Sequence, residues 1–315
     1  MIRAATIGAG RRGASIHYPA IKRLKDVELV AACDLDEDLL REKADRFEIP
    51  RRFTDYKEML QSIDVDIVYA VTQPMHVARI ALDCLNAGKH VFIEKPPGMN
   101  LDEARQLAQT AEANGRVGAV AFQRRYGKVI TAALKQINAR GGLSTFLIEF
   151  HKNFVTKPGP LEVHPMVDDG IHVSDLLLFL GGGEVKSVTT SRHNHFTDWN
   201  STFSAQVEFA NGALGVFYFI RSAGARYLRY ELHGRGISAY IRPPEIGEVF
   251  SDDEADPTIL NASEIAGSEE NIVIDGVVDM HEHFIECVQT GAEPRSSLRS
   301  SVASMELMER VLHGT

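Results

Sequence analysis

A lysine placed just after an apolar run is the first residue of this sequence that could take part in chemistry. The segment from His90 to Ile93 has the character of a buried strand, and Glu94-Lys95-Pro96 follows it directly. A lysine held between a carboxylate and a rigid proline could stabilise an oxygen that becomes negative during a reaction. From its position alone, Lys95 is equally well interpreted as a surface lysine in a polar loop.

A second group of chemically capable residues lies in the other half of the chain. Asp168, His172 and Asp175 are spaced at i, i+4 and i+7, so an α-helix would place them on one face. A carboxylate beside an imidazole can orient the ring and adjust its affinity for a proton, as general acid–base catalysis requires. A capping aspartate with a hydrogen-bonded structural histidine would explain the same residues, and on these residues alone it is the stronger interpretation.

The elements that must position these residues begin with the first 34 residues of the chain. An apolar strand from Ile2 to Ile7 leads into a glycine turn, a helical segment to about residue 25 and a second strand that closes on Asp34. In such a unit Gly8 allows the tight turn, Gly10 lets the backbone approach a pyrophosphate, and Gly13 lets the helix pack close to the sheet. The sequence therefore predicts a dinucleotide-binding site.

Charged residues around this turn indicate which dinucleotide is bound. The phosphates are expected at the N-terminus of the helix, where free N–H groups favour an anion and Arg11 and Arg12 add positive charge. Asp34 follows Gly13 by about 20 residues, the spacing of a carboxylate that binds the ribose 2′-hydroxyl. Because a carboxylate repels a 2′-phosphate and Leu35 offers no cation, NAD is predicted, although Arg11 and Arg12 leave NADP open.

Strands and helices continue to alternate up to residue 122. Further apolar strands are predicted at Val65–Val71, His90–Ile93 and Val117–Phe122. This alternation indicates an α/β fold with a parallel, doubly wound sheet, so residues 1–122 are predicted to form a Rossmann-type NAD(P)-binding domain. Ligands of such sheets bind beyond the carboxyl ends of the strands, which places Thr72, His76 and Glu94 near the cofactor.

From Gln123 onward the pattern changes, and residues 123–315 are predicted to form a second domain that binds substrate. Strands are predicted at Leu143–Phe150, Val185–Ser191, Thr202–Phe209, Gly215–Ile220 and Tyr227–His233. Asn211-Gly212 is a hairpin signal, so this α+β domain should contain a mostly antiparallel sheet. The acidic stretch 251–270 is predicted to be a loop, and the helices at 278–290 and 300–312 could return to the first domain.

The bulk composition excludes several classes of protein. The formal net charge of −9 argues against a nucleic acid or an anionic membrane as partner. No run approaches the roughly 18 apolar residues of a membrane span, and no signal peptide is evident, so a reducing cytoplasm is the expected location. The three cysteines are far apart, and His281-Glu282-His283 and His193-x-His195 lack a third ligand, so no metal site is predicted.

The motifs occur in one order along the whole chain. They are Gly8-x-Gly10-x-x-Gly13, Asp34, Thr72, His76, Glu94-Lys95-Pro96, Arg124-Arg125-Tyr126 and Asp168-x-Gly170-x-His172-x-x-Asp175. In this combination the chain resembles the glucose-fructose oxidoreductase/inositol dehydrogenase/MocA (Gfo/Idh/MocA) family. Glu-Lys-Pro followed by Asp-x-Gly-x-His is far more specific than the glycine turn, and it carries most of the resemblance.

The resemblance implies an NAD(P)-dependent oxidoreductase that transfers a hydride between nicotinamide and a secondary hydroxyl group of a polyol, sugar or sugar derivative. Lys95, Asp168 and His172 correspond to the catalytic lysine, aspartate and histidine of the family. His172, oriented by Asp168, would remove the hydroxyl proton while Lys95 stabilises the oxygen. The Lys95-Pro96 bond is expected to be cis, as it often is in relatives.

The same resemblance suggests residues of the substrate pocket. Arg125, His151 and Asn153 look like positions that line this pocket in inositol dehydrogenases. A histidine and an amide at i and i+2 on one strand would point to the same side of a sheet.

The resemblance also implies two alternative functions and an oligomeric state. The family contains glycosidases that oxidise and re-reduce their substrate with tightly held NAD, and a non-catalytic nucleotide-binding regulator is the other alternative. Family members often pair through the open face of the second-domain sheet, so a homodimer or homotetramer is expected. The alternate apolar residues of two predicted strands would suit this pairing; they are Val207, Phe209, Val216, Tyr218 and Ile220.

Overall fold

The computed structural model describes residues 1–157 and 162–314. The chain folds into two compact units. The first unit contains residues 1–122 and 277–302, and the second contains residues 123–276 and those from 303 onward.

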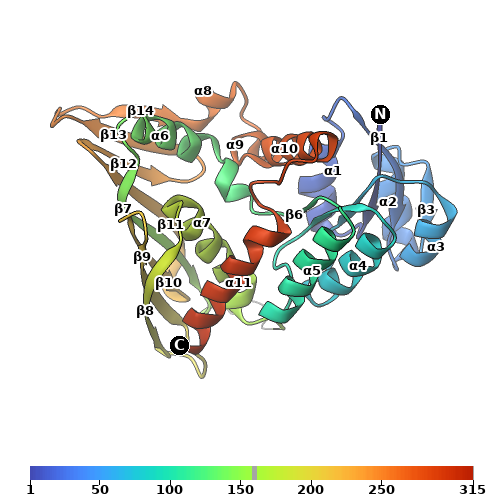
Figure 1. The fold of residues 1–315 in the computed structure, drawn as a ribbon, viewed down its shortest axis with the longest axis horizontal. Helices are drawn as coiled ribbons and strands as arrows, with labels where there is room; N and C mark the ends of the chain where they lie inside the picture. Colours follow the sequence, from blue (N-terminus) through green and yellow to red (C-terminus); the bar gives the residue numbers. More distant parts are fainter. Residues whose placement is uncertain (158–161, 315) are drawn as a thin grey trace. The chain divides into compact units, whose positions relative to one another are not determined.

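The first unit is built on a parallel sheet that has six strands in the described part of the chain (Figure 1). The strands are β1 (Ile2–Ile7), β2 (Val27–Cys33), β3 (Arg51–Phe53), β4 (Ile67–Ala70), β5 (His90–Ile93) and β6 (Gly118–Val120). Their order is β3-β2-β1-β4-β5-β6, and all neighbouring pairs are parallel. The predicted doubly wound sheet is confirmed. The order reverses between β1 and β4, which is where such sheets bind ligands.

Some helices of this unit begin where the sequence supplies a capping side chain. α2 (Glu37–Arg46) follows Asp36, whose carboxylate accepts a hydrogen bond from the Leu39 backbone at 3.0 Å, and α5 (Leu101–Ala113) follows Asn100 in the same way. The remaining helices are η1 (Gly13–His17), α1 (Tyr18–Ile21), α3 (Tyr56–Ser62), α4 (Pro74–Asn86) and α10 (Val277–Thr290).

Helix α10 comes from the far end of the chain and packs within the first unit. On α10, the ring centroids of Phe284 and His281 lie 5.4 Å and 4.5 Å from that of Phe92 on β5. All three side chains are buried, so residues 277–302 complete the core of this unit. Helix α11 (Leu298–His313) then carries the chain into the second unit.

The second unit contains an eight-stranded sheet within the described residues. The strands are β7 (Leu143–Asn153), β8 (Val185–His193), β9 (Thr202–Phe209), β10 (Leu214–Ile220), β11 (Ser222–Gly234), β12 (Ile237–Arg242), β13 (Ile246–Ser251) and β14 (Thr258–Asn261). β7 and β10 pair in parallel, whereas the other neighbours are antiparallel. The predicted mostly antiparallel sheet is confirmed, and Asn211-Gly212 connects β9 and β10 as expected.

One face of this sheet is covered by helices. Figure 1 shows α6 (Lys128–Asn138) and α7 (Ile171–Gly181) on the same side of the strands. Phe146, Ile148 and Phe150 of β7 are buried toward these helices, and the strands beside β7 bury Phe217, Phe219, Tyr230 and Leu232. The short helices η2 (Gln123–Tyr126), η3 (Met166–Gly170), α8 (Ala262–Ala266) and α9 (Asn271–Ile274) complete the unit.

The segment 251–270 is not the loop that its acidic composition predicts. It contains the edge strand β14 and the helix α8, and Asn261 caps this helix by accepting hydrogen bonds from two backbone N–H groups. The acidic residues are concentrated in the turn that precedes β14, where Asp252 and Asp253 have φ angles of 55° and 62°. The sequence reading also missed β12 and β13, which pair with each other and extend the sheet.

The apolar residues expected on the open face of this sheet divide between its two faces. Val207 and Phe209 are buried on the helix-covered side, because β9 pairs with β10 in a register that places Val207 opposite the buried Gly215. Val216 and Ile220 lie on the other face with Tyr218, which is 43% exposed.

Candidate active site

The glycine turn after β1 is shaped by the space around each glycine. Gly8 has a φ angle of +106°, and a Cβ atom there would lie 2.1 Å from the Val71 carbonyl oxygen. A Cβ on Gly13 would lie 3.0 Å from the Gly8 carbonyl oxygen, so both positions need glycine for internal packing. Gly10 differs, because no other part of the described chain lies within 4 Å of its Cβ position. The open space above Gly10 fits the approach of a pyrophosphate.

Asp34 at the end of β2 is held against this turn. Its Oδ2 atom accepts a hydrogen bond from the Ala9 backbone at 2.6 Å, and its Oδ1 atom accepts one from the Asp36 backbone at 3.0 Å. Each carboxylate oxygen can accept a further bond, as a ribose diol requires. The adjacent Leu35 is 89% exposed and provides no cation for a 2′-phosphate. The turn and this carboxylate therefore fit NAD.

Thr72 and His76 lie beside the same turn. Gly8 and Thr72 follow the adjacent strands β1 and β4, and a Cβ atom on Gly8 would lie 3.3 Å from the Thr72 methyl group. His76 is exposed in the first turn of α4, which begins at Pro74. Their predicted cofactor contacts remain predictions.

Glu94 is the centre of a buried polar group that we call the Glu94 cluster, made of Arg12, His17, Glu94 and His281. Glu94 Oε1 accepts hydrogen bonds from Arg12 Nε at 2.9 Å and His17 Nε2 at 2.8 Å. Burial by itself raises the pKa of Glu94, but the bond from His17 and the charges of Arg12 and Lys95 lower it to about 2. Arg12, expected at the phosphates, thus contacts Glu94 in this structure, and both Arg11 and Arg12 are exposed.

The cluster extends inward to helix α10. His17 Nδ1 lies 3.0 Å from His281 Nε2, and burial lowers the pKa of His281 well below its usual value. With His281 neutral and His17 donating Nε2–H to Glu94, His281 donates Nε2–H to His17 Nδ1. His281 Nδ1 has no hydrogen-bond partner among the described residues. Because His281 belongs to this chain of bonds, it does not form a metal pair with His283.

Lys95 is anchored through its backbone to this cluster. Its N–H group donates to Glu94 Oε2 at 3.0 Å, and the Lys95-Pro96 bond is cis, as the resemblance implies. Its side chain is half-buried, and its catalytic role remains a prediction. The buried carboxylate therefore fixes the backbone from which this lysine projects.

In the second unit, Asp168 lies on a π-helical turn, η3, that leads into α7. Bonds of the i→i+5 type in such a turn change the helical period, so the α-helical spacing from Asp168 to His172 and Asp175 does not apply across it. Gly170 permits close packing here, since a Cβ atom would lie 2.5 Å from the Met166 sulfur. His172 is 5% exposed, and its Nδ1 atom has no hydrogen-bond partner in residues 1–157 and 162–314.

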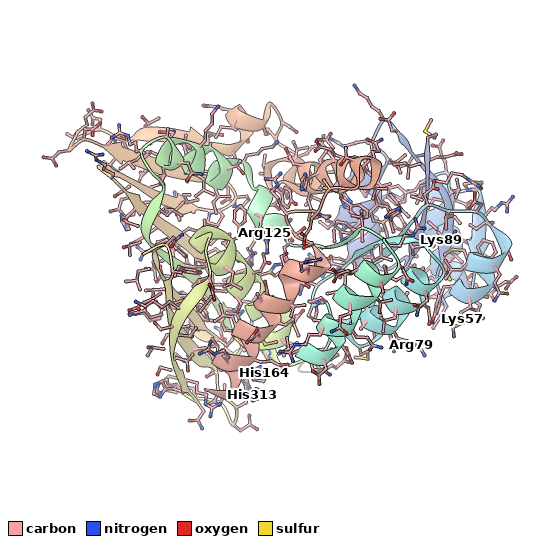
Figure 2. The ribbon with its side chains drawn as sticks, in the orientation of Figure 1. Lys57, Arg79, Lys89, Arg125, His164 and His313 are labelled. Carbon is pink, nitrogen blue, oxygen red and sulfur yellow. The ribbon has the colours of Figure 1, made fainter. Side chains whose placement is uncertain are left out.

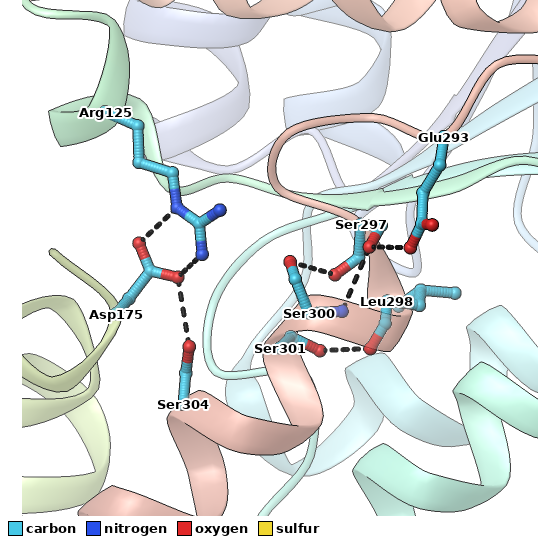
Figure 3. Close-up of polar contacts among 8 residues, drawn as sticks. All are labelled: Arg125, Asp175, Glu293, Ser297, Leu298, Ser300, Ser301 and Ser304. Carbon is cyan, nitrogen blue, oxygen red and sulfur yellow. Dashed lines mark hydrogen bonds and ion pairs between the residues drawn. The ribbon is translucent and has the colours of Figure 1, made fainter. Parts of the chain in front are cut away.

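Asp175 and Arg125 form a buried ion pair rather than two separate site residues. Arg125, labelled in Figure 2, donates through Nε to Asp175 Oδ2 at 2.9 Å and through Nη2 to Oδ1. Ser304 Oγ also donates to Oδ1, at 3.1 Å, as Figure 3 shows. Burial raises the pKa of Asp175, and the charge of Arg125 opposes that rise. The proposed contact between Arg125 and substrate remains a prediction.

His151 and Asn153 lie on β7 at the positions predicted, with Lys152 between them. His151 stacks on Tyr227 with a centroid distance of 6.3 Å, and the Asn153 side chain accepts a bond from the Thr156 backbone. Lys152 Nζ instead lies 2.5 Å from Asp169 Oδ2. Because adjacent strand residues point to opposite faces, Lys152 reaches the segment that carries Asp168 and His172. The substrate contacts of His151 and Asn153 remain predictions.

The sequence reading missed a buried cationic group that we call the Arg221 cluster, made of Arg124, Lys152, Asp169 and Arg221. Arg221 Nη2 lies 3.3 Å from Asp169 Oδ2, and the Arg221 side chain is fully buried. One signal could have found it: a charged residue directly follows the apolar run of β10. Lys95 belongs to the first unit, and this cluster belongs to the second.

Two negative findings concern only the described part of the chain. Among these residues, no group of three or more histidine, cysteine, aspartate or glutamate side chains could hold a metal ion. In the same residues, no helix combines the length and the apolar character that a bilayer crossing requires.

Comparison with known proteins identifies the family of both halves of the chain. Residues 2–122 match the family model "Oxidoreductase family, NAD-binding Rossmann fold", and residues 140–239 match the model "GFO/IDH/MocA C-terminal domain". Together these matches cover more than half of the 315 residues.

Three curated relatives are named dehydrogenases. D-glucoside 3-dehydrogenase of Escherichia coli is 28% identical over 68% of this chain and 68% of its own length. Trans-1,2-dihydrobenzene-1,2-diol dehydrogenase of Bos taurus is 28% identical over 60% of this chain, and the match spans only 59% of its length. scyllo-Inositol 2-dehydrogenase (NAD(+)) of Bacillus subtilis is 26% identical over 93% of this chain and 88% of its own.

The fold also occurs in solved structures. A dehydrogenase from Chromobacterium violaceum has a TM-score of 0.90 at 18% sequence identity and covers 100% of this chain and 95% of its own. At this identity the similarity concerns the fold alone.

Proposed function

Because this chain belongs to the Gfo/Idh/MocA family of NAD-binding oxidoreductases, we propose that it is a dehydrogenase of a polyol, sugar or sugar derivative. It would transfer a hydride between NAD and a secondary hydroxyl group. The names of relatives that act on a glucoside and on scyllo-inositol support this substrate class.

One observation carries the proposal. Lys95 follows β5 at the carboxyl edge of a parallel sheet whose glycine turn fits a dinucleotide, and its backbone N–H is bound by the buried carboxylate of Glu94 at 3.0 Å. A cation anchored in this way needs little reorganisation to stabilise an oxygen that becomes negative.

The proposed roles follow from the chemistry of each side chain. When bound, NAD supplies the hydride acceptor. Lys95 would hold the substrate oxygen, and His172 would remove its proton through a ring nitrogen, with Asp168 orienting the ring. Gly10 and Asp34 would bind the pyrophosphate and the ribose and so fix the cofactor relative to Lys95.

The test is turnover by a Lys95→Ala variant, which should lose at least about 1,000-fold in kcat because the oxygen loses its stabilising charge. Binding of NADH, followed by fluorescence, should stay within about threefold, since the glycine turn is intact. Lys89→Ala is the matched control, because Lys89 precedes the same strand at its opposite end (Figure 2). A Lys95→Ala enzyme with normal rates would refute the assignment.

The assays should be run with NAD and NADP in parallel. Asp34 and the exposed Leu35 support a preference for NAD. Tighter binding of NADP than of NAD would contradict this preference, and cofactor that survives purification without net NADH production would favour the glycosidase alternative.

We further propose that the chain forms a homodimer or homotetramer through the sheet face opposite α6 and α7. That face carries Tyr218, Tyr227 and Tyr240, which are 43%, 43% and 39% exposed. Light scattering of wild type and of Tyr218→Glu measures the effect, and a wild-type monomer would contradict the proposal.

A further inference from the structure

The carboxyl ends of two parallel strands in the second unit bring two cations together. β7 and β10 pair in parallel, with Ile220 opposite His151, so Lys152 and Arg221 are the next residues at the same edge. Their side chains share the helix-covered side of the sheet, and both contact Asp169 Oδ2, at 2.5 Å and 3.3 Å. This edge therefore adjoins the segment that carries Asp168 and His172.

The Arg221 guanidinium is held in place by aromatic rings. Its central carbon lies 3.5 Å from the centroid of Phe219 and 4.5 Å from that of Phe150. Nε, Nη1 and Nη2 are all buried and make no hydrogen bond to any described residue. Burial lowers the pKa of Arg221 to about 9, although Asp169 opposes this shift. Buried arginines normally have their donors paired, so the missing partner requires an explanation.

The surroundings of Phe150 contain more positive than negative charge. Arg124, Arg221 and Lys152 lie 4.4 Å, 4.5 Å and 5.4 Å from its ring centroid. Asp169 contacts both Lys152 and Arg221, Asp168 adds a second negative charge near Arg221, and Arg226 adds a further positive charge. Positive charge therefore exceeds negative charge around Arg221, so an anionic ligand would complete the group.

We infer that Lys152 and Arg221 bind a carboxylate of the substrate, so that the substrate is a polyhydroxylated carboxylic acid, such as a sugar acid. This inference rests on the proposed function, because it places the acid next to the segment of the same unit that carries Asp168 and His172. Planar guanidinium groups bind carboxylates through two parallel hydrogen bonds, which suits the unpaired nitrogens of Arg221. The Lys152 side chain, 28% exposed, is the point of entry, and Arg221 lies behind it.

The experiment compares pairs of compounds that differ in the carboxylate. kcat/KM is measured with NAD for glucuronate against glucose and for galacturonate against galactose, and calorimetry measures binding of gluconate against glucitol. Wild type should favour the acids at least tenfold in both measurements. Arg221→Met should abolish this preference, and Arg221→Lys should restore part of it.

Two further variants make the result decisive. Arg140→Met removes a partly exposed arginine that pairs with Asp252 elsewhere in this unit, and it should leave the preference unchanged. Lys152→Met tests the same site if Arg221→Met does not fold. Ligand-free Arg221→Met should melt close to the temperature of wild type, because Asp169 keeps its shorter contact with Lys152 when the longer one to Arg221 is lost. A purely structural Arg221 predicts a lower melting temperature and an unchanged preference, which would overturn the inference.

The outcomes separate this inference from the proposed function. Turnover of neutral sugars without any preference for acids would refute the carboxylate site and leave the dehydrogenase intact. Gluconate binding that depends on Arg221, without turnover of any compound, would support the site and refute the dehydrogenase. Absence of both turnover and gluconate binding would refute both.

Discussion

The two units contain buried polar clusters of opposite character. In the Glu94 cluster, the carboxylate receives bonds from Arg12, His17 and the Lys95 backbone, so the charges are paired within the protein. In the Arg221 cluster, a single oxygen of Asp169 contacts both Lys152 and Arg221, and no described residue hydrogen bonds to the Arg221 guanidinium. A complete cluster can position a catalytic group, whereas an incomplete one is suited to receive a ligand.

Removing the central carboxylate of the complete cluster should have the largest effect. Glu94→Ala leaves Arg12 and His17 without their acceptor, and breaking a buried ion pair in this way costs about 3–5 kcal/mol of unfolding free energy. kcat should also fall at least about 100-fold, because the Lys95 backbone loses its anchor. Urea unfolding and NADH kinetics measure the two effects.

A matched control is Glu42→Ala, which removes an exposed glutamate of α2 and should change stability by less than about 0.5 kcal/mol. If Glu94→Ala were as stable as wild type, the residues of the Glu94 cluster would not depend on Glu94 for their stability.

The loss of stability at low pH should also depend on Glu94, and this effect should be smaller than that of Glu94→Ala. The pKa of Glu94 is lowered to about 2 in the folded protein, from the 4.5 of an ordinary glutamate. Its contribution to stability is therefore full above pH 4.5 and is lost as the pH falls toward 2, by about 3 kcal/mol in total. Urea unfolding between pH 6 and pH 2.5 should show this loss in wild type. In Glu94→Gln this loss of unfolding free energy should be smaller than in wild type by at least about 2 kcal/mol. Equal losses in the two proteins would argue against the low pKa of Glu94.

Much of the first unit could be predicted because its signals are local. A strand, a glycine turn, a helix and a closing acid lie within 34 consecutive residues, and the parallel order follows from alternation along the chain. The proposed catalytic role of Lys95 was predicted from a motif, but the contact that anchors its backbone was not. His17 and His281 are separated by 264 residues, and no periodicity indicates that they meet.

The second unit was harder because its polar partners come from different elements and its helix is irregular. Arg125 and Asp175 were treated as separate candidates, yet they pair across 50 residues. The π-helical turn at η3 breaks the α-helical period on which the Asp168–His172 alignment was based. In the sequence, Arg221 is a single charged residue after an apolar strand, and nothing local shows that Phe150 of another strand packs against its guanidinium.

Replacing His281 by phenylalanine should have the smallest effect, and it tests whether the complete cluster acts beyond its charges. The new ring keeps the packing against Phe92, and the orphaned Nδ1 atom disappears together with the bond to His17. These changes offset each other, so unfolding free energy should change by about 1 kcal/mol or less. His17 nevertheless loses the donor that fixes its tautomer, so its bond to Glu94 weakens and kcat should fall severalfold.

His281→Asn, which keeps a donor, should recover part of kcat, and His283→Phe on the same helix should leave kcat unchanged. Unaltered kcat in His281→Phe would limit the positioning role to Arg12, His17 and Glu94.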